Sequence, residues 1–154
     1  MVNTHRNRRI VIVGSDHAGF EAKIFVIDYL KRNGFEVIDL GTHSDKSVDY
    51  PDYGVAVAKA LRNHDRASGI ILCGTGIGIS IAANKVEGAR AALCTTPFHA
   101  EMARKHNDAN ILAMGGRTTT QQEMEAIMDV WFATDFEGGR HQQRIEKIHA
   151  LTNK

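Results

Sequence analysis

Cys73 occupies the position in this sequence that most directly suggests chemistry. It follows an apolar stretch and opens the glycine-rich run Cys73-Gly-Thr-Gly-Ile-Gly78, after which a helix is expected. A thiol at a helix N-terminus ionises more readily than a free thiol, so Cys73 is a candidate base or nucleophile. Gly74, Gly76 and Gly78 let backbone N–H groups approach an anion, which indicates a site for a phosphate or an oxyanion. The alternative is a buried, apolar cysteine without a chemical role.

The glycine run does not match the common nucleotide-binding motifs. Its third glycine comes one residue early for a dinucleotide fingerprint, and a Walker loop would need Gly-Lys-Ser/Thr at its end. Cys94 also follows an apolar stretch, but no glycine loop comes after it, so we interpret Cys94 as a structural thiol. The two cysteines do not form a Cys-x-x-Cys pair, and a dithiol redox site is therefore not expected.

Two histidines are candidates for proton transfer. His17 lies beside Asp16 in the loop that ends the first apolar stretch. A titrating ring next to a carboxylate suits acid–base chemistry, and the alternative is that Asp16 only caps the next helix. His106 lies near the end of a predicted helix, where the alternative is an ordinary surface or core histidine. No set of His, Cys and Glu residues has the spacing of metal ligands, so no metal site is expected.

Three arginines in the last third of the chain are candidates for binding a phosphate group. Arg140 and Arg144 are four residues apart at the start of a predicted helix, so both guanidinium groups share one face. Such a pair can clamp a phosphate, and Arg117 is a third candidate cation after a predicted strand. The alternative is a solvated basic face. The candidates together predict proton transfer on a small phosphorylated substrate, without a redox cofactor or metal.

The elements that must position these residues alternate along the chain. We expect five short apolar strands, at residues 9–14, 36–40, 69–73, 89–94 and 110–114, with helices between them. This order predicts a three-layer α/β/α fold with a Rossmann-like open parallel sheet of about five strands. In such sheets ligands bind beyond the carboxyl ends of the strands, where the glycine loop and the Asp16–His17 pair fall.

Local signals mark the helices between these strands. Pro51 and Thr96-Pro97 predict two helix starts, and Thr120 with Glu123 predicts a capping box before a third helix. The first helix is expected to pack through residues that recur at helical spacing, namely Phe20, Ile24, Ile27 and Lys31. The last helix carries the apolar residues Ile145, Ile148 and Leu151.

The composition fits an ordinary globular protein. The chain has 154 residues, of which 43% are hydrophobic and 24% charged, and 19 basic against 18 acidic residues give a net charge of +1. This balance argues against broad binding to nucleic acid or membranes. Two cysteines and the lack of an apolar run that could span a bilayer favour a reduced, cytoplasmic setting. We expect a flexible tail over residues 1–9 and a single domain over residues 10–154.

Six motifs in order resemble the ribose-5-phosphate isomerase B family, which includes the subunits of galactose-6-phosphate isomerase. The resemblance covers residues 10–151, and the ordered set is far more specific than either glycine loop alone. The motifs are Gly-Ser-Asp-His-Ala-Gly at 14–19, Asp-Tyr-Pro at 49–51, Cys-Gly-Thr-Gly-Ile-Gly at 73–78, Ala-Ala-Asn-Lys at 82–85, His-Asn-Asp at 106–108 and Gly-Gly-Arg-His-Gln-Gln-Arg at 138–144.

The resemblance implies interconversion of ribose 5-phosphate and ribulose 5-phosphate in the pentose phosphate pathway, through an enediolate and without a cofactor. It implies that Cys73 is the base, that Thr75 and its loop hold the oxyanion, and that His106 opens the sugar ring. Some members use a glutamate six residues after the cysteine position, where this chain has Ile79 and so matches the cysteine type. The implied substrate-binding residues are Asp16, His17, Tyr50, Gly74, Gly76, Ile77, Gly78, Asn107, Arg117, Arg140 and Arg144.

The resemblance also implies a homodimer in which both subunits build each active site and the C-terminal helix reaches the partner. Some members pair two dimers into a tetramer. Two alternatives remain open at this point. The chain could isomerise a six-carbon sugar phosphate, such as allose or galactose 6-phosphate, or it could be a non-enzymatic phosphate-sensing module.

Overall fold

One parallel sheet forms the centre of the molecule. The computed structural model describes residues 9–154, and within them five strands pair in the order β2-β1-β3-β5-β4, all parallel. The predicted fold class is confirmed. The predicted tail lies, apart from Arg9, outside the described residues. The strands are β1 (Ile10–Ser15), β2 (Glu36–Asp39), β3 (Ser68–Cys73), β4 (Ala91–Leu93) and β5 (Ile111–Gly115).

The three central strands, β1, β3 and β5, are apolar along most of their length because helices cover both faces of the sheet. In β1, Val11 and Val13 enter one core and Ile12 enters the other. The same alternation continues in β3, where Ile70 and Leu72 belong to the first core. Such continuous apolar strands are typical of a parallel sheet buried on two sides.

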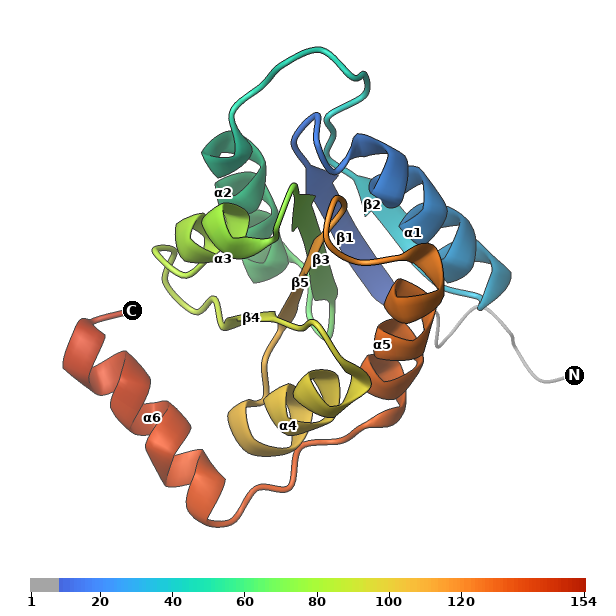
Figure 1. Cartoon of the computed structure of the whole chain (residues 1–154). Helices are drawn as coiled ribbons and strands as arrows, with labels where there is room; N and C mark the ends of the chain where they lie inside the picture. The colour runs from blue at the N-terminus through green and yellow to red at the C-terminus, as the bar shows by residue number, and fades with distance from the viewer. Residues whose placement is uncertain (1–8) are drawn as a thin grey trace, which may run out of the picture.

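The helices divide into two layers around the sheet (Figure 1). The first layer packs on the core that contains Val11 and Val13, and it consists of α1 (Phe20–Arg32), α4 (Pro97–Asn107) and α5 (Gln121–Ala133). The second layer packs on the opposite face and consists of α2 (Tyr50–Ala60) and α3 (Ile77–Ala83), with a short 3-10 turn, η1 (Leu61–Asn63), after α2. Among residues 9–154, no helix combines the length and the apolar character needed to cross a bilayer.

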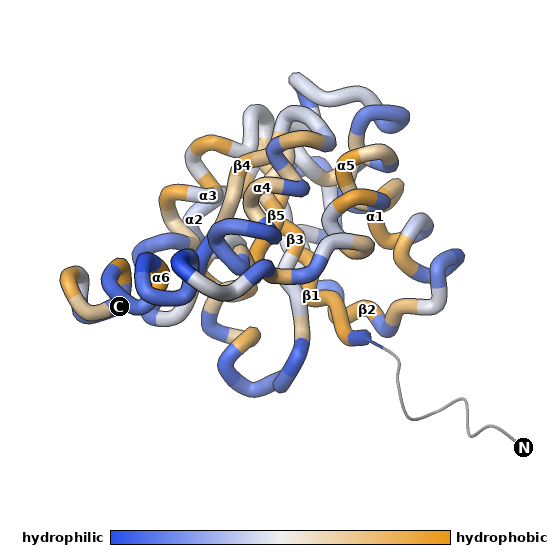
Figure 2. Tube along the Cα trace, turned by 90° about the horizontal axis from the view of Figure 1, so that it is seen from below, coloured by the Kyte–Doolittle hydropathy of each residue, from blue (hydrophilic) through white to orange (hydrophobic). Residues whose placement is uncertain are grey.

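The last helix, α6 (Arg140–Thr152), belongs to neither layer. Figure 1 shows it starting beside α4 and lying outside both layers, and its C-terminal end returns to the segment after α3, where the backbone N–H of Gly88 donates to the carbonyl of Lys154. Of its predicted apolar residues only Ile145 is buried, whereas Ile148 is 47% exposed and Leu151 is 76% exposed. Figure 2 shows this apolar part of α6 near the C-terminus, at the margin of the molecule. The helix therefore presents apolar surface that its own chain does not cover.

Several predicted helix ends are confirmed because the signals that set them are local. Thr96 accepts a hydrogen bond from the backbone N–H of His99 at 3.1 Å. Thr120 accepts from the N–H of Glu123 at 3.1 Å, and the Glu123 carboxylate accepts from the N–H of Thr120 at 2.8 Å. The last pair is the predicted capping box, which satisfies two backbone donors at the start of α5.

Two expectations about α1 are wrong. Asp16 does not cap the helix: its carboxylate accepts the N–H of Gly19, and the helix begins only at Phe20. The inner face is also different, since Ile24 is 54% exposed. The buried residues are Ala22, Lys23, Val26, Tyr29 and Leu30. Apolar residues occur around the whole helix, so their spacing alone does not determine which face is buried, and the predicted face did not include the buried Lys23.

One edge of the sheet is closed by a side chain rather than by another strand. The Asn84 amide, just after α3, donates to the carbonyl of Ala91 at 2.9 Å and accepts its N–H at 2.7 Å. These are the outward-facing backbone groups of β4, which is the last strand on this side. Asn84 thus satisfies backbone groups that an edge strand would otherwise leave open.

We predict that Thr120→Ala lowers the free energy of unfolding by about 1 kcal/mol, because the variant loses the cap of α5. Urea denaturation followed by circular dichroism measures the change. The matched control is Gln121→Ala, an exposed neighbour that should stay within about 0.5 kcal/mol of the parent protein. An equal loss in both variants would contradict a specific contribution of the capping box.

Candidate active site

The strand order reverses direction between β1 and β3, and this reversal determines where a site can form. The chain runs from β1 outward to β2, and then returns to place β3 on the other side of β1. The loops that leave β1 and β3 therefore diverge and leave a crevice at the carboxyl edge of the sheet. The two loops start side by side, since the backbone N–H of Asp16 donates to the carbonyl of Leu72 at 3.2 Å.

Cys73 ends β3 at this crevice. Cys73 is 4% exposed, and its thiol sulfur accepts a hydrogen bond from the backbone N–H of Gly76 at 3.2 Å. Gly76 has φ of 80°, and a Cβ there would lie 2.6 Å from a methyl carbon of Leu93 and 2.8 Å from the carbonyl carbon of Met114. Only glycine fits this position, so the turn that aims an N–H at the sulfur depends on it.

Two neighbouring residues, Tyr50 and Arg117, hold the rest of the glycine loop. A Cβ at Gly78 would lie 2.6 Å from the Tyr50 ring, so this ring rests directly on the loop. Arg117 donates its backbone N–H to the carbonyl of Gly74 at 2.9 Å, and its side chain passes close to the same glycine. Thr75 accepts the N–H of Ile77 at 3.2 Å, which shapes the start of α3.

Asp16 and His17 line the other side of the crevice. Asp16 is 6% exposed and is held by the N–H of Gly19 at 3.0 Å. The Nδ1 atom of His17 lies 3.1 Å from both the backbone nitrogen and the backbone oxygen of Val48. His17 therefore anchors the long loop that precedes Tyr50 and α2. The carboxyl edge thus brings together Asp16, His17, Tyr50, Cys73, the loop from Gly74 to Gly78, and Arg117.

An ion pair that sequence reasoning missed lies at the start of this loop. Lys23, which is 1% exposed, pairs with Asp39 at the end of β2. Asp39 also accepts the N–H of Gly41 at 2.9 Å, and Gly41 in turn accepts the N–H of Ser15 at 2.7 Å. Because a buried charge is costly without a partner, the pair fixes the start of the loop that His17 anchors further along.

The other predicted residues lie at the opposite edge of the sheet. The helix α4 runs from the carboxyl end of β4 back to the amino end of β5, so His106 and Asn107 lie at the amino edge. Eleven residues of α4 span about 16 Å, which separates His106 from the strand ends near Cys73. Arg140 and Arg144 lie with His106, on the first turns of α6 (Figure 1).

His106, Asn107, Arg140 and Arg144 form what we call the amino-edge group. Beside it lies an arrangement of side chains that sequence spacing did not reveal. The rings of His106 and His141 stack with their centroids 4.3 Å apart and their planes 15° apart. The Nε2 atom of His106 lies 3.8 Å from a carboxylate oxygen of Glu137. Burial lowers the pKa of His141, and the nearby His106, Arg140 and Arg144 lower it further, while Glu137 opposes them.

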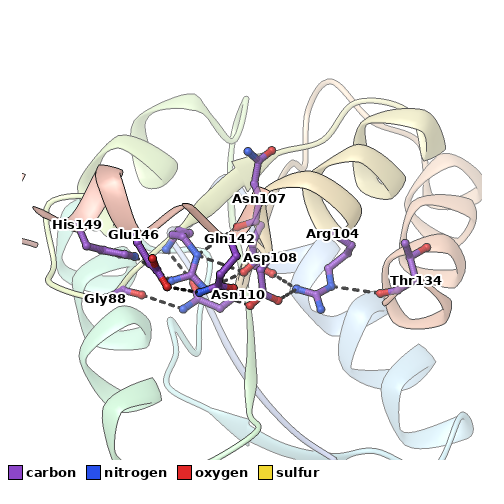
Figure 3. A network of polar contacts seen from close by, with 11 residues as sticks. Gly88, Arg104, Asn107, Asp108, Asn110, Thr134, Gln142, Glu146 and His149 are labelled. Carbon is purple, nitrogen blue, oxygen red and sulfur yellow. Dashed lines mark hydrogen bonds and ion pairs between the residues drawn. The ribbon is translucent and has the colours of Figure 1, made fainter. Parts of the chain in front are cut away.

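The end of α4 is held in place by Arg90, another residue that sequence reasoning missed; Figure 3 labels its partners Asn107, Asp108 and His149. Its guanidinium group donates to the carbonyl of Asn107 at 3.2 Å and to that of Asp108 at 2.8 Å. His149 of α6 lies 3.1 Å from the same group. Arg104 adds a bond to the Asp108 carboxylate at 3.0 Å. Arg90 therefore positions the helix end that carries His106 and Asn107 relative to α6.

The model of the Ribose/Galactose Isomerase family matches residues 11–148 of the chain. The chain belongs to this family. It is 45% identical over 144 residues to ribose-5-phosphate isomerase B of Escherichia coli K12, which covers 94% of this chain and 97% of that protein. The family resemblance inferred from the six motifs is therefore confirmed.

Solved structures of family members have the same fold. Ribose-5-phosphate isomerase B of Clostridium thermocellum matches with a TM-score of 0.91 and 50% identity, over 94% of this chain and 97% of that one. Type B ribose 5-phosphate isomerase of Trypanosoma brucei matches with a TM-score of 0.90 and 44% identity, over 94% and 99% of the two chains.

A separate hollow lies at the other edge of the sheet. A basin of about 970 Å³ opens at the amino edge, between Arg66, Arg90, Arg104 and Trp131. Of the motif residues it contains only Asp108, and two of its arginines already bind that residue. None of the candidate catalytic or substrate-binding residues lines this basin.

We predict that Cys94 does not react with iodoacetamide at pH 8 in the folded protein. The residue is 1% exposed, and burial raises the pKa of its thiol to about 12, so almost none of the reactive thiolate is present. Mass spectrometry of Cys73→Ala, in which Cys94 is the remaining thiol, should show no adduct before unfolding and one adduct in denaturant. Equal labelling rates in both states would contradict the structural interpretation of Cys94.

Proposed function

We propose that the chain interconverts D-ribose 5-phosphate and D-ribulose 5-phosphate through an enediolate, without a cofactor. One observation carries the proposal: a buried thiol at the crevice receives a backbone N–H and adjoins a glycine loop, a carboxylate and Arg117. The names of relatives at 45% and 50% identity over nearly the whole chain support the substrate. They favour it over a six-carbon sugar phosphate or a non-enzymatic phosphate-sensing module.

In the proposed reaction Cys73 moves one proton. Its thiolate takes the proton from C2 of the open-chain aldose, and the electrons of the C–H bond form the C1–C2 double bond of the enediolate. Return of the proton to C1, with a proton shift from O2 to O1, gives the ketose. Thr75 and the N–H groups of the Gly74–Gly78 loop hold the oxyanion, a contribution worth roughly 10²–10³-fold in rate for one well-placed donor.

His106 and the arginines have separate tasks in this proposal. His106 transfers the proton that opens the furanose ring, and Asn107 contacts the sugar beside it. Arg117 meets the phosphate together with Arg140 and Arg144, and this remote binding energy orients the reacting carbons. Asp16, His17 and Tyr50 contact the sugar from the carboxyl edge.

This division of tasks requires two copies of the chain. Cys73 and Arg117 lie at one edge of the sheet, whereas His106 and Arg140 lie at the other. A two-fold dimer brings the carboxyl edge of one copy to the amino-edge group of its partner, and symmetry then creates two identical sites. The exposed apolar residues of α6, Ile148 and Leu151, supply surface for the partner.

The setting proposed for the enzyme is the cytoplasm, in the non-oxidative pentose phosphate pathway. Both cysteines are free thiols, which suits a reducing compartment. A second dimer could join through other surfaces to give the tetramer that some family members form.

We predict that Cys73→Ala lowers kcat by at least roughly 10²–10⁴-fold, the contribution of a positioned base, while substrate still binds. Coupled detection of ribulose 5-phosphate measures turnover, and calorimetry measures substrate binding. Chelator should leave the turnover of the wild type unchanged. The matched control is Cys94→Ala, which should retain turnover because Cys94 lies outside the crevice. Undiminished turnover in Cys73→Ala would overturn the assigned base. A kcat/KM that is higher for allose 6-phosphate than for ribose 5-phosphate would overturn the assigned substrate.

We also predict that two inactive variants restore activity when they share a dimer. Cys73→Ala and His106→Asn are each expected to lose turnover. Unfolded together and refolded, they form mixed dimers in which one site has both wild-type residues, so roughly a quarter of the wild-type activity returns. Each variant refolded alone is the control. If the mixture stays as inactive as its components, Cys73 and His106 do not act in one shared site.

A further inference from the structure

Three metal-ligating side chains meet where α4 approaches the start of α6. His106 comes from α4, His141 from the first turn of α6, and Glu137 from the segment between the helices α5 and α6. One ligand atom from each of the three lies within 4.8 Å of the others. The backbone N–H of Glu137 donates to the carbonyl of Lys105 at 3.1 Å, so this segment is tied to the residue next to His106.

His141 provides a second, independent indication of a ligand. The residue is 6% exposed, yet its Nε2 atom has no hydrogen-bond partner among the described residues. Buried polar atoms in folded proteins nearly always have a partner, and an unpaired one is costly. The His141 ring stacks on His106, and one of its nitrogens lies within 4.8 Å of a ligand atom of each of the other two residues.

The donor set selects a class of metal ion. Two imidazoles and one carboxylate are three ligands of a kind that zinc uses, with a fourth position left to water or another ligand. Mg²⁺ and Ca²⁺ prefer sites made of oxygen atoms, so they match this set poorly. Arg140 and Arg144 lie nearby and oppose any cation, which leaves the Glu137 carboxylate as the negative charge within the cluster.

The ligands need only a local adjustment to close around an ion. Zinc bonds of about 2.0–2.2 Å place ligand atoms roughly 3.3 Å apart, so the observed spacing must shrink by up to about 1.5 Å. The stacked rings must also turn about their side-chain bonds until their nitrogens converge. Gly138 and Gly139 separate Glu137 from His141, and among the described residues nothing lies within 4 Å of a Cβ built at either glycine.

We propose that His106, Glu137 and His141 bind one divalent transition-metal ion of the zinc type, and that the bound ion inhibits the enzyme reversibly. The inhibition rests on the proposed function, since it follows from the ring-opening task of His106. An imidazole nitrogen that coordinates zinc cannot exchange a proton with the sugar. The binding itself does not depend on that task.

The test is a titration of the chelator-stripped, untagged full chain with Zn²⁺, followed by calorimetry. The wild type should bind one ion per chain. His141→Asn and Glu137→Gln should each weaken binding by more than about tenfold. Circular dichroism checks that each variant folds. The matched control is His64→Asn, which removes a histidine that is not part of the cluster and should bind as the wild type does. Co²⁺ in place of Zn²⁺ should give the visible absorption of a nitrogen-ligated ion, and the two ligand variants should lose it.

Each result decides one part of the proposal. Equal zinc affinity in the wild type and in both ligand variants would overturn the site. Zinc should inhibit wild-type turnover, chelator should restore it, and Glu137→Gln should resist inhibition. Stoichiometric binding without inhibition would overturn the regulatory part. A protein that shows no isomerase turnover before zinc is added would contradict the proposed function instead, and the calorimetric result would still decide the metal site.

Discussion

The constraint on which the whole arrangement depends is the reversal of strand order between β1 and β3. Parallel strands end at a common edge, and the loops that follow them diverge only where the order reverses. At that point the Asp16 backbone bonds to Leu72, so the loops are joined at their base and open above it. The Cys73 thiol, the glycine loop and the Asp16–His17 pair all take their positions from this junction. The pair between the buried Lys23 and the more exposed Asp39 extends the same support to the loop before α2.

The second constraint is the direction of α4. A helix that connects two parallel strands must run antiparallel to them, so its last residues lie at the edge opposite to the strand ends. His106 is one of those last residues, and Arg90 fixes the helix end against α6. A single chain therefore holds two incomplete sets of functional groups. Association of two chains would complete both sets of functional groups, and it would also cover the apolar part of α6.

The fold was predictable where signals are local or periodic. The five strands and the capping box at Thr120 follow from short patterns, and they are confirmed within one or two residues at most ends. The face of α1 was not predictable, because apolar residues surround the helix and the buried Lys23 depends on Asp39, which is distant in sequence. The largest difference at a strand end is in β4, which spans Ala91–Leu93 where residues 89–94 were predicted.

For the candidate site, the sequence allowed the residues to be identified but not all of their contacts. Residue types and motifs identified the candidates around Cys73, and the strand order explains why they lie together. The opposite placement of His106 could have been inferred from the direction of its helix, but its contacts with Glu137 and His141 could not. These residues are 31 and 35 positions away along the chain, and only the packing of α6 on α4 brings them near.

The side chain of Asn84 has a consequence for how this protein can associate. An open sheet has two margins where a neighbouring molecule can add a strand, and uncontrolled addition leads to aggregation. Here the margin at β4 is three residues long, and Asn84 mimics a neighbouring backbone by bonding both polar groups of Ala91. The opposite margin, β2, is only four residues long and carries an acidic residue at each end. Growth by strand addition is therefore poorly supported at both margins, which favours helices and loops as the surfaces for specific assembly.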